Sequence, residues 1–342
     1  MIKKIYKFTT PCLLLYNKIC NEKRKYVLTK LVIQIPCYNE EDTILTTLNA
    51  IPKKINGFDE LEIIVINDGS TDNSAEIARN WGATVINIET NKGLANAFKT
   101  GIKEALSRKA DVIVNTDADN QYCADDIEKI TAPILQKEAD MVVGARDIIN
   151  IKDFTLIKKI LQKVGSAILR LLSSKEVADA PSGFRAFSRE SALKINVFDN
   201  YTYTMETLVQ AGAKGLRVKS VPIRTNPKMR KSKLVKNICG YIFKSAKTTI
   251  RMFIVYKPFR FFITIAIILF LIGLIPVCRF LYFYLNGLGR GHIQSLIVAS
   301  VFLISAVQIG IIAIVGDLLS INRRLLEDIQ LRLKKAELEQ KN

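Results

Sequence analysis

The sequence predicts an α/β domain with a mostly parallel sheet, followed by two membrane-spanning helices. Short apolar runs alternate with helical patterns from residue 31 to about residue 144. Two long uncharged runs follow, at 261–277 and 296–315. Alternating helices and continuously apolar strands are typical of a parallel sheet covered on both faces. The two long runs approach the ~20 apolar residues that cross the hydrocarbon core of a bilayer.

Each element of the α/β part is predicted from the spacing of its apolar residues and from the residues that begin or end helices and strands. Strands are expected at 31–35, 62–67, 83–88, 111–116 and 140–145, and helices at 41–51, 73–81, 94–107 and 124–136. Asn73 and Glu76 have the spacing of a capping box at the start of the second helix. A basic amphipathic helix is expected over 154–175, either packed on the sheet or lying at a membrane surface.

The positive charge is confined to two stretches of the chain. The formal net charge is +18, and residues 1–30 together with residues 224–260 account for all of it. The second stretch abuts the first long apolar run, which spans a bilayer if it extends past Arg279. Basic residues beside a span favour the cytoplasmic side and attract anionic lipids. The sequence therefore predicts a cell-membrane protein whose α/β domain lies in the cytoplasm, and it disfavours nucleic acid as a partner.

Five parts are expected along the chain. They are a basic N-terminal arm (1–30), the α/β domain (31–225), a basic amphipathic juxtamembrane segment (226–258), a two-helix transmembrane hairpin (259–320) and a cytoplasmic tail (321–342). The apolar stretch of the arm is too short for a signal peptide, so a membrane-surface helix and a disordered arm both remain open. The hairpin is compatible with a homo-oligomer.

Polar clusters follow four of the predicted strands. They read PCYNE (36–40), NDGSTD (67–72), DADNQ (117–121) and GAR (144–146). The carboxyl ends of parallel strands are where ligands bind in such sheets. The chain has no P-loop, no GxGxxG and no GxSxG, which argues against NTPase, dehydrogenase and serine hydrolase chemistry. With one histidine and six scattered cysteines, a zinc site is not expected.

The acids of DADNQ indicate a cation. Asp117 and Asp119 are one residue apart and would repel each other without one. Mg²⁺ and Mn²⁺ prefer oxygen ligands, and Gln121 could add a third oxygen. Further along the same edge, Lys92 and Gly93 open a helix whose amides could meet a phosphate or form a plain cap.

In this order and spacing, PCYNE, NDGSTD, NKGLANA (91–97), DADNQ and SGFRAF (182–187) resemble glycosyltransferase family 2. Within it the chain looks like the polyprenyl-phosphate glycosyltransferases of the dolichol-phosphate mannose synthase type. The resemblance covers residues 31–225. It implies a GT-A (Rossmann-like) fold, a UDP- or GDP-sugar donor, a polyprenyl (dolichyl or undecaprenyl) phosphate acceptor, and Mg²⁺ or Mn²⁺.

The resemblance and the expected strand ends together suggest four groups of site residues. The expected donor-binding residues are Pro36, Tyr38, Glu40, Asp68, Lys92, Gly93, Asp117, Ala118 and Asp119. The expected metal ligands are Asp117, Asp119 and Gln121, and the expected catalytic residues are Asp117, Asp119 and Arg146. The residues expected to bind the acceptor phosphate are Ser182, Arg185, Arg224, Arg230 and Lys233. Ser232 could donate a further hydrogen bond to it. Asp68 could instead be an ordinary turn acid before Gly69.

The implied reaction is an inverting transfer in which a phosphate oxygen attacks the anomeric carbon of the sugar. A phosphate monoester is already an anion at neutral pH and needs no strong base. A hydroxyl acceptor on a glycan would need one, and Glu206 is the candidate base for that alternative. A third alternative is a non-enzymatic membrane scaffold that uses the basic stretches to bind lipid.

Overall fold

A computed structural model describes residues 29–146, 178–198, 203–227, 250–251, 253–287 and 293–340. Its centre is a seven-stranded sheet in the order β3-β2-β1-β4-β6-β5-β7. The strands are β1 (Lys30–Cys37), β2 (Glu60–Asp68), β3 (Thr84–Ile88), β4 (Val112–Asn115), β5 (Met141–Arg146), β6 (Arg185–Ser188) and β7 (Val218–Ile223). The five strands expected from the sequence are all present.

Six of the seven strands run in the same direction. β1 pairs in parallel with β2 and β4, β2 with β3, and β5 with β7, whereas β6 runs antiparallel to both β4 and β5. The mostly parallel sheet is therefore confirmed. Because β6 is reversed, the residues that precede it meet the carboxyl ends of its neighbours. The strand order also changes direction between β1 and β4, which is the switch point where such sheets bind ligands.

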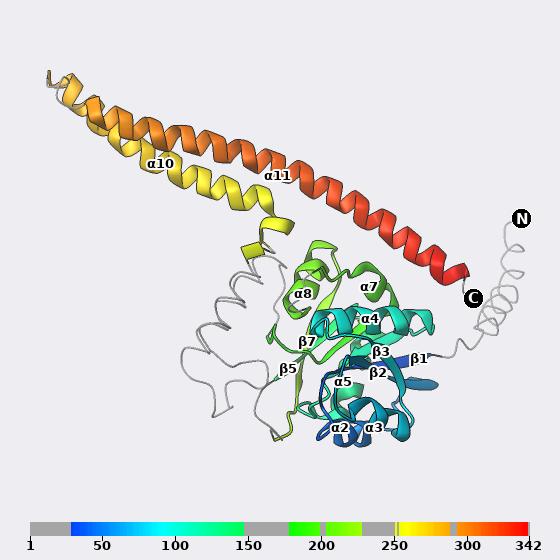
Figure 1. Ribbon diagram of the computed structural model, residues 1–342. Helices are drawn as coiled ribbons and strands as arrows, with labels where there is room; N and C mark the ends of the chain where they lie inside the picture. Colours follow the sequence, from blue (N-terminus) through cyan, green and yellow to red (C-terminus); the bar gives the residue numbers. More distant parts are fainter. Residues whose placement is uncertain are drawn as a thin grey trace, which may run out of the picture.

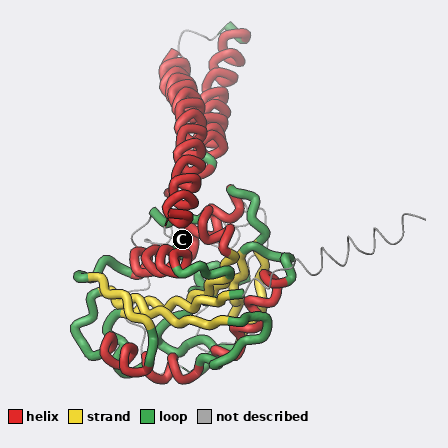
Figure 2. The backbone as a smooth tube through the Cα atoms, turned by 90° about the vertical axis from the view of Figure 1, so that its right-hand side faces the viewer, coloured by secondary structure: helices red, strands yellow, loops and turns green. Residues whose placement is uncertain are grey.

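Helices cover both faces of the sheet (Figures 1 and 2). One face carries α2 (Ile44–Ala50), α3 (Ser74–Trp81) and α5 (Ile127–Leu135), preceded by the short 3₁₀ helix η1 (Ala124–Asp126). The other carries α4 (Leu94–Ser107), α7 (Arg189–Lys194) and α8 (Thr204–Ala213). Successive residues of β1 alternate between the two resulting cores: Leu31 and Ile33 join the first, and Val32 the second.

The start of α3 differs from the expected capping box. The Asn73 side chain makes no capping hydrogen bond. Instead, Asp72 Oδ1 accepts from the amide and the hydroxyl of Ser74, and the Asn73 amide donates to Glu41. The Asn73–Glu76 capping prediction is therefore wrong, because a carboxylate one residue earlier and a glutamate from the neighbouring loop bind these amides.

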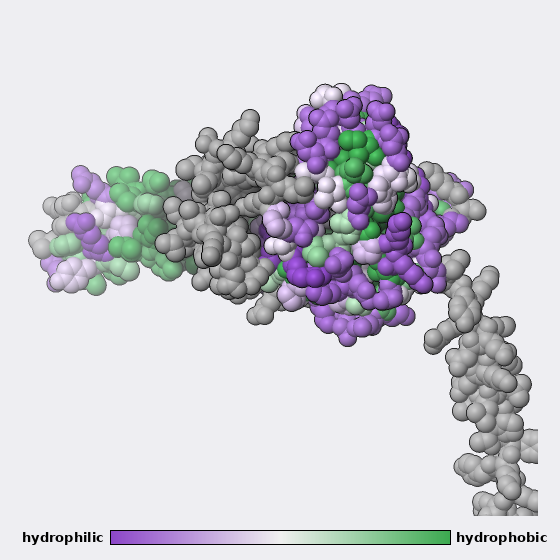
Figure 3. Space-filling model, turned by 90° about the horizontal axis from the view of Figure 1, so that it is seen from below, coloured by the Kyte–Doolittle hydropathy of each residue, from purple (hydrophilic) through white to green (hydrophobic). Residues whose placement is uncertain are grey.

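Two long apolar helices follow the domain. Within the described residues, α10 (Pro258–Leu285) and α11 (Ile293–Gln340) are both long and apolar enough to cross a membrane. They lie side by side as a hairpin (Figure 1) and expose many large apolar side chains. The visible face of the α/β domain is mostly hydrophilic (Figure 3). The buried residues of α11 are small and recur every seven positions, at Ala299, Ala306, Ala313 and Ser320. This spacing allows the two helices to approach closely along one seam.

Residues 321–340, which the sequence set apart as a tail, continue α11 without a break. Several predictions fall on residues outside the described ranges. These are most of the arm at 1–30, the helix at 154–175, most of the juxtamembrane segment, and Arg230, Ser232 and Lys233.

Candidate active site

The loops after β1 and β2 are joined at the carboxyl edge of the sheet. The Asn39 amide donates to Ser70 Oγ at 3.0 Å, and Asn39 Oδ1 accepts from the Thr71 amide at 2.8 Å. The Glu40 amide donates to Ser74 Oγ at 2.7 Å. Asn39 has a φ of 53°, a conformation that asparagine tolerates better than most side chains. PCYNE and NDGSTD therefore form one continuous surface, and Tyr38 is 43% exposed on it.

Asp68 ends β2 and is buried beneath this surface. Its two carboxylate oxygens accept hydrogen bonds from the amides of Lys92 (3.0 Å) and Gly93 (2.8 Å), at the start of α4. Those two amides are therefore not the free phosphate-binding amides that the sequence suggested. Gly69 must be glycine, since its φ is 69° and a Cβ there would lie 2.6 Å from the Asn91 nitrogen. Asp68 thus fixes the 91–93 loop against the end of β2.

The acid pair follows β4 in a tight turn. Asn120 has a φ of 54°, and Asp119 Oδ1 accepts from the Gln121 amide at 3.2 Å. The carbonyl of Ala118 accepts from Thr47 Oγ1 at 2.9 Å, which ties the turn to α2. The chain turns after Thr116 instead of continuing as a strand, as expected, so the two carboxylates need not point to opposite sides of a strand.

The surroundings of Asp117 destabilise the negative charge of its carboxylate. Burial, together with the nearby charge of Asp119, raises the pKa of Asp117 to about 7, although Arg146 opposes the shift. Glu40 adds a smaller repulsion from the loop after β1. The negative charges of Asp119 and Glu40 thus both act on Asp117, and a divalent cation would offset this repulsion.

The side chains available as metal ligands fit an ion such as Mg²⁺, which takes its remaining ligands from substrate and water. Among the described residues, no three His, Cys, Asp or Glu side chains are close enough together to hold a metal by themselves. Mg²⁺ usually keeps several waters and uses one or two carboxylates plus substrate phosphates. Asp117 and Asp119 provide that number of carboxylates, with Gln121 next to them in the turn.

The segment before β6 packs directly on the acid turn. A Cβ on Gly183 would lie 3.0 Å from both carboxylate oxygens of Asp117. The Gly183 amide donates to the Tyr122 hydroxyl at 3.0 Å, and that hydroxyl is itself hydrogen-bonded to Asp117. Ser182 is fully buried and hydrogen-bonds Tyr122. Ser182 therefore supports the acid turn through Tyr122. Because it is buried, it is not available to donate a hydrogen bond to an acceptor phosphate, as the sequence suggested.

Below Gly183, a buried polar chain crosses the sheet. Gln34 Nε2 donates to Asn115 Oδ1 at 2.8 Å, and Asn115 Nδ2 donates to the carbonyl of Gly183 and the hydroxyl of Tyr203, each at 2.8 Å. The Tyr203 ring stacks on Phe98 of α4. Sequence reasoning missed this chain, although a glutamine and an asparagine inside apolar strands were a visible signal.

Arg146, at the end of β5, is held by a buried acid. Its guanidinium makes two hydrogen bonds to Asp179, from Nε at 2.7 Å and from Nη2 at 3.1 Å, and Asp179 is fully buried. Burial disfavours the positive charge, but Asp179 raises the pKa of Arg146 above its usual value. Arg146 acts electrostatically on Asp117 and Tyr122, so it lies near the acid turn, and its catalytic role stays a prediction. Asp179 was not predicted, because nothing local marks the acid in ADAPSG as its partner.

Arg185 is not an acceptor-phosphate residue. It is fully buried, and burial lowers its pKa to about 10. Its guanidinium donates to the carbonyls of Ser182 (2.8 Å), Ala180 (2.6 Å) and Thr204 (2.6 Å) and to the hydroxyl of Thr207 (2.6 Å). Arg185 therefore ties the segment before β6 to the start of α8, and the sequence prediction is wrong because an isolated motif reveals charge and not burial.

Arg224, just after β7, is likewise paired within the protein. Its Nη2 lies 2.8 Å from Asp126 Oδ1, and its amide donates to Asp126 Oδ2 at 2.6 Å. Burial alone would raise the pKa of Asp126, but the hydrogen bonds from Arg224 lower it to about 2. Two residues later, Asn226 Nδ2 donates to the carbonyl of Asn120 at 3.0 Å. The segment leaving β7 is therefore fixed beside the acid turn. The Arg224 side chain is 58% exposed, so its expected role at the acceptor phosphate stays a prediction.

Glu206, the candidate base for a hydroxyl acceptor, lies inside α8 and is 1% exposed. Its Oε2 accepts from the Phe198 amide at 3.0 Å, and its Oε1 accepts from Gln210 at 3.3 Å. The base prediction is wrong, because both oxygens are committed inside the helical layer.

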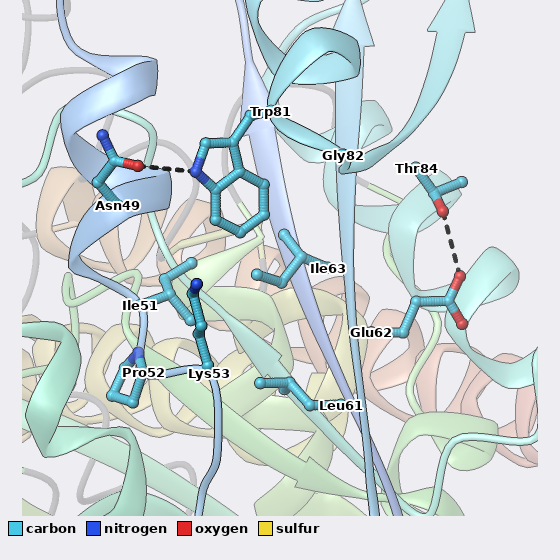
Figure 4. A pocket seen from close by; sticks show the side chains of 10 residues that line it. All are labelled: Asn49, Ile51, Pro52, Lys53, Leu61, Glu62, Ile63, Trp81, Gly82 and Thr84. Atoms are coloured by element: carbon cyan, nitrogen blue, oxygen red, sulfur yellow. Dashed lines mark hydrogen bonds between the residues drawn. The ribbon is translucent and has the colours of Figure 1, made fainter.

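A separate hollow lies at the opposite edge of the sheet (Figure 4). Its volume is about 530 Å³, and it is lined by the end of α2 and the first residues of β2 and β3. Trp81 donates to Asn49 and Thr84 to Glu62 around it. None of the expected site residues borders this hollow, so it is not the candidate active site.

Comparisons with known proteins agree with this arrangement. Residues 32–195 match the model of the family described as Glycosyl transferase family 2. The UDP-N-acetylglucosamine–dolichyl-phosphate N-acetylglucosaminyltransferase of Methanococcus voltae is 36% identical over 215 residues, covering 56% of this chain and 83% of the relative. An uncharacterized protein of Methanocaldococcus jannaschii is 37% identical over 214 residues, covering 61% of this chain and 85% of the relative.

More distant matches point the same way. The undecaprenyl-phosphate mannosyltransferase of Micrococcus luteus is 24% identical over 200 residues, covering 55% of this chain and 80% of the relative. Among solved structures, glucosyl-3-phosphoglycerate synthase from Mycobacterium tuberculosis, in complex with Mn²⁺, UDP and phosphoglyceric acid, superposes with a TM-score of 0.52 at 18% identity. That match covers 67% of this chain and 78% of the other and shows the shared GT-A fold. The chain is therefore an enzyme that belongs to glycosyltransferase family 2.

Proposed function

We propose that this glycosyltransferase transfers a sugar from a UDP- or GDP-sugar to a polyprenyl phosphate at the cytoplasmic face of the cell membrane, with inversion at the anomeric carbon. The observation that carries the proposal is the acid turn after β4, which lies beside the loops after β1 and β2 and the end of β5 in a domain attached to an apolar hairpin. The named relatives act on dolichyl or undecaprenyl phosphate, which supports the same acceptor class here.

Each part of the carboxyl edge has a task in this proposal. The loops that contain Tyr38, Glu40 and Asp68 would bind the nucleoside. Asp117 and Asp119, with Gln121, would hold Mg²⁺ or Mn²⁺, which when bound offsets the charge of the departing diphosphate. Arg146 keeps its positive charge next to Asp117, and Asp179 holds its guanidinium in one orientation.

The acceptor needs no strong base on this enzyme. A phosphate monoester is an anion at neutral pH, so its oxygen can attack without losing a proton to a side chain. The candidate base for a hydroxyl acceptor, Glu206, is buried and hydrogen-bonded. This favours the phosphate acceptor over a glycan hydroxyl.

A transfer assay tests the proposal. The purified full chain is incubated with Mg²⁺ or Mn²⁺, a polyprenyl phosphate and a panel of labelled UDP- and GDP-sugars. The proposal expects a labelled lipid-soluble product with at least one donor, and the product anomer reports inversion. Folded enzyme that forms no such product with any donor, yet glycosylates a lipid-linked sugar hydroxyl, would replace the proposed acceptor.

A further inference from the structure

The C-terminal part of α11 packs back onto the catalytic domain. After its apolar portion, the helix continues across the layer formed by α7 and α8 (Figures 1 and 2). Leu331 and Leu338, seven residues apart, pack against the core on this face of the sheet. The segment 321–340 is thus one continuous helix with the membrane hairpin and also part of the surface of the catalytic domain.

Charged contacts reinforce this packing. Lys214, just after α8, lies 3.0 Å from Glu327 Oε2, and their side chains are only 17% and 11% exposed. Lys214 also donates to the carbonyl of Lys194. Lys334 Nζ donates to Asn196 Oδ1 at 2.5 Å. Two separate positions on α11 are therefore tied to the α7–α8 layer.

A third contact lies where the hairpin begins. Tyr256, two residues before α10, is 4% exposed and belongs to the core of the α7–α8 face. The guanidinium of Arg323 lies 3.9 Å from the centre of the Tyr256 ring, and Arg323 Nη1 lies 3.6 Å from Glu327 Oε1. The start of α10, the middle of α11 and the catalytic domain therefore meet around Arg323 and Glu327.

We propose that residues 321–340 form a latch that holds the catalytic domain at one height and orientation above the lipid surface, with Glu327 and Lys214 as positioning residues for the lipid acceptor. This inference rests on the proposed function. A polyprenyl phosphate is confined to the membrane plane, so the acid turn must be held at a fixed distance from that plane. Misplacement by ~1 Å can cost ~10²-fold in rate. A helix that spans the membrane and continues over the domain supplies this constraint.

Reversing the charge of Glu327 tests whether this residue positions the domain for a lipid acceptor or only stabilises the fold. Glu327→Lys is compared with Asp328→Lys, its neighbour. The Asp328 side chain is 55% exposed and pairs with Arg332 on the same helix. Two acceptors are used: a long-chain polyprenyl phosphate in phosphatidylcholine–phosphatidylglycerol vesicles, and a water-soluble two-isoprene phosphate. Glu327→Lys is expected to lower kcat/KM about tenfold for the vesicle acceptor and less than about twofold for the soluble one. Asp328→Lys should change neither.

A charge-swapped double variant and a measurement of amide exchange provide two further tests of the latch. The double variant Lys214→Glu/Glu327→Lys should recover more than half of the decrease in the logarithm of kcat/KM for the vesicle acceptor. Amide exchange over 322–340 should be slow in the wild type and faster in Glu327→Lys, or in the milder Glu327→Gln if the reversal does not fold. Equal losses with both acceptors, or fast exchange in the wild type, would overturn the latch. A wild type inactive on both acceptors, with slow exchange over 322–340, would instead count against the proposed function alone.

Discussion

Gly183 and Asp117 lie in contact across the carboxyl edge of the sheet, and the contact leaves no room for a side chain at residue 183. A Cβ there would lie 3.0 Å from both carboxylate oxygens and 2.9 Å from the hydroxyl of Tyr203. Tyr203 cannot easily retreat, since its ring stacks on Phe98 with the centres 3.9 Å apart. The position of the acid turn thus depends on a glycine from a distant motif.

We expect Gly183→Ala to displace Asp117 and to weaken Mn²⁺ binding by about 10- to 100-fold, because outer contacts orient metal ligands. Titration of the purified chain with Mn²⁺, followed by electron paramagnetic resonance, measures this. Gly310→Ala is the control, since a Cβ there meets nothing within 4 Å. Unchanged affinity in Gly183→Ala would show that Asp117 is not a ligand.

Arg185→Met should destabilise the domain by more than about 3 kcal/mol, because it leaves three buried carbonyls without their donor. Urea unfolding of the solubilised chain measures the loss, with the exposed Arg79→Met as the control. A phosphate-binding role would give a different pattern, in which stability is unchanged and only KM for the acceptor rises.

The pairing of Asp126 with Arg224 predicts a pH-dependent contribution to stability. The pKa of Asp126 is lowered to about 2 in the folded chain, against about 3.9 for an unperturbed aspartate. Its contribution is therefore complete above about pH 4 and is lost as the pH falls through about 2.

Asp126→Asn should accordingly cost about 1–3 kcal/mol at pH 7, and the difference from the wild type should shrink below about pH 4. Urea unfolding at pH 7, 5 and 3 measures this. Asp125→Asn, whose side chain is 68% exposed, should cost little at any pH. A difference that grows on acidification would refute the assignment.

The small-residue seam of the hairpin can be tested at its centre. Ala306 is buried on α11, and Val307 beside it is 62% exposed. Ala306→Leu should destabilise the hairpin by roughly 1–3 kcal/mol through overpacking, whereas Val307→Leu should be nearly neutral. Thermal unfolding in detergent compares the two, and equal midpoints would argue against close packing along this seam.

The fold was predictable where the sequence pattern is local. The first strand was recognisable as an apolar run, although β1 continues through Pro36 to Cys37. The following apolar runs alternate with amphipathic helices, so the succession of these elements along the chain was predictable. β6, α7, α8 and β7 were not predicted as elements, and the reversal of β6 depends on pairing between distant segments. Asp117 and Asp119 were singled out because they follow a buried strand, and their role as metal ligands stays a prediction.

The wrong assignments share one physical cause. Arg185 and Glu206 are charged residues near recognisable motifs, but the sequence alone does not reveal that both are buried against partners. Asp179 was missed for the converse reason, since its partner Arg146 lies 33 residues away in the chain. The packing of residues 321–340 on the domain was also missed, although the seven-residue spacing of Leu331 and Leu338 was a visible signal.

The dependence of nucleotide-sugar binding on the metal and on Asp119 tests the central claim most directly. Calorimetry of the full chain with UDP- and GDP-sugars, with and without Mn²⁺, compares the wild type, Asp119→Ala and the control Asp125→Asn. We predict that one donor binds only with Mn²⁺, that Asp119→Ala weakens this binding by about 100-fold or more, and that Asp125→Asn binds normally. Equally tight binding without the metal, or in Asp119→Ala, would contradict the account.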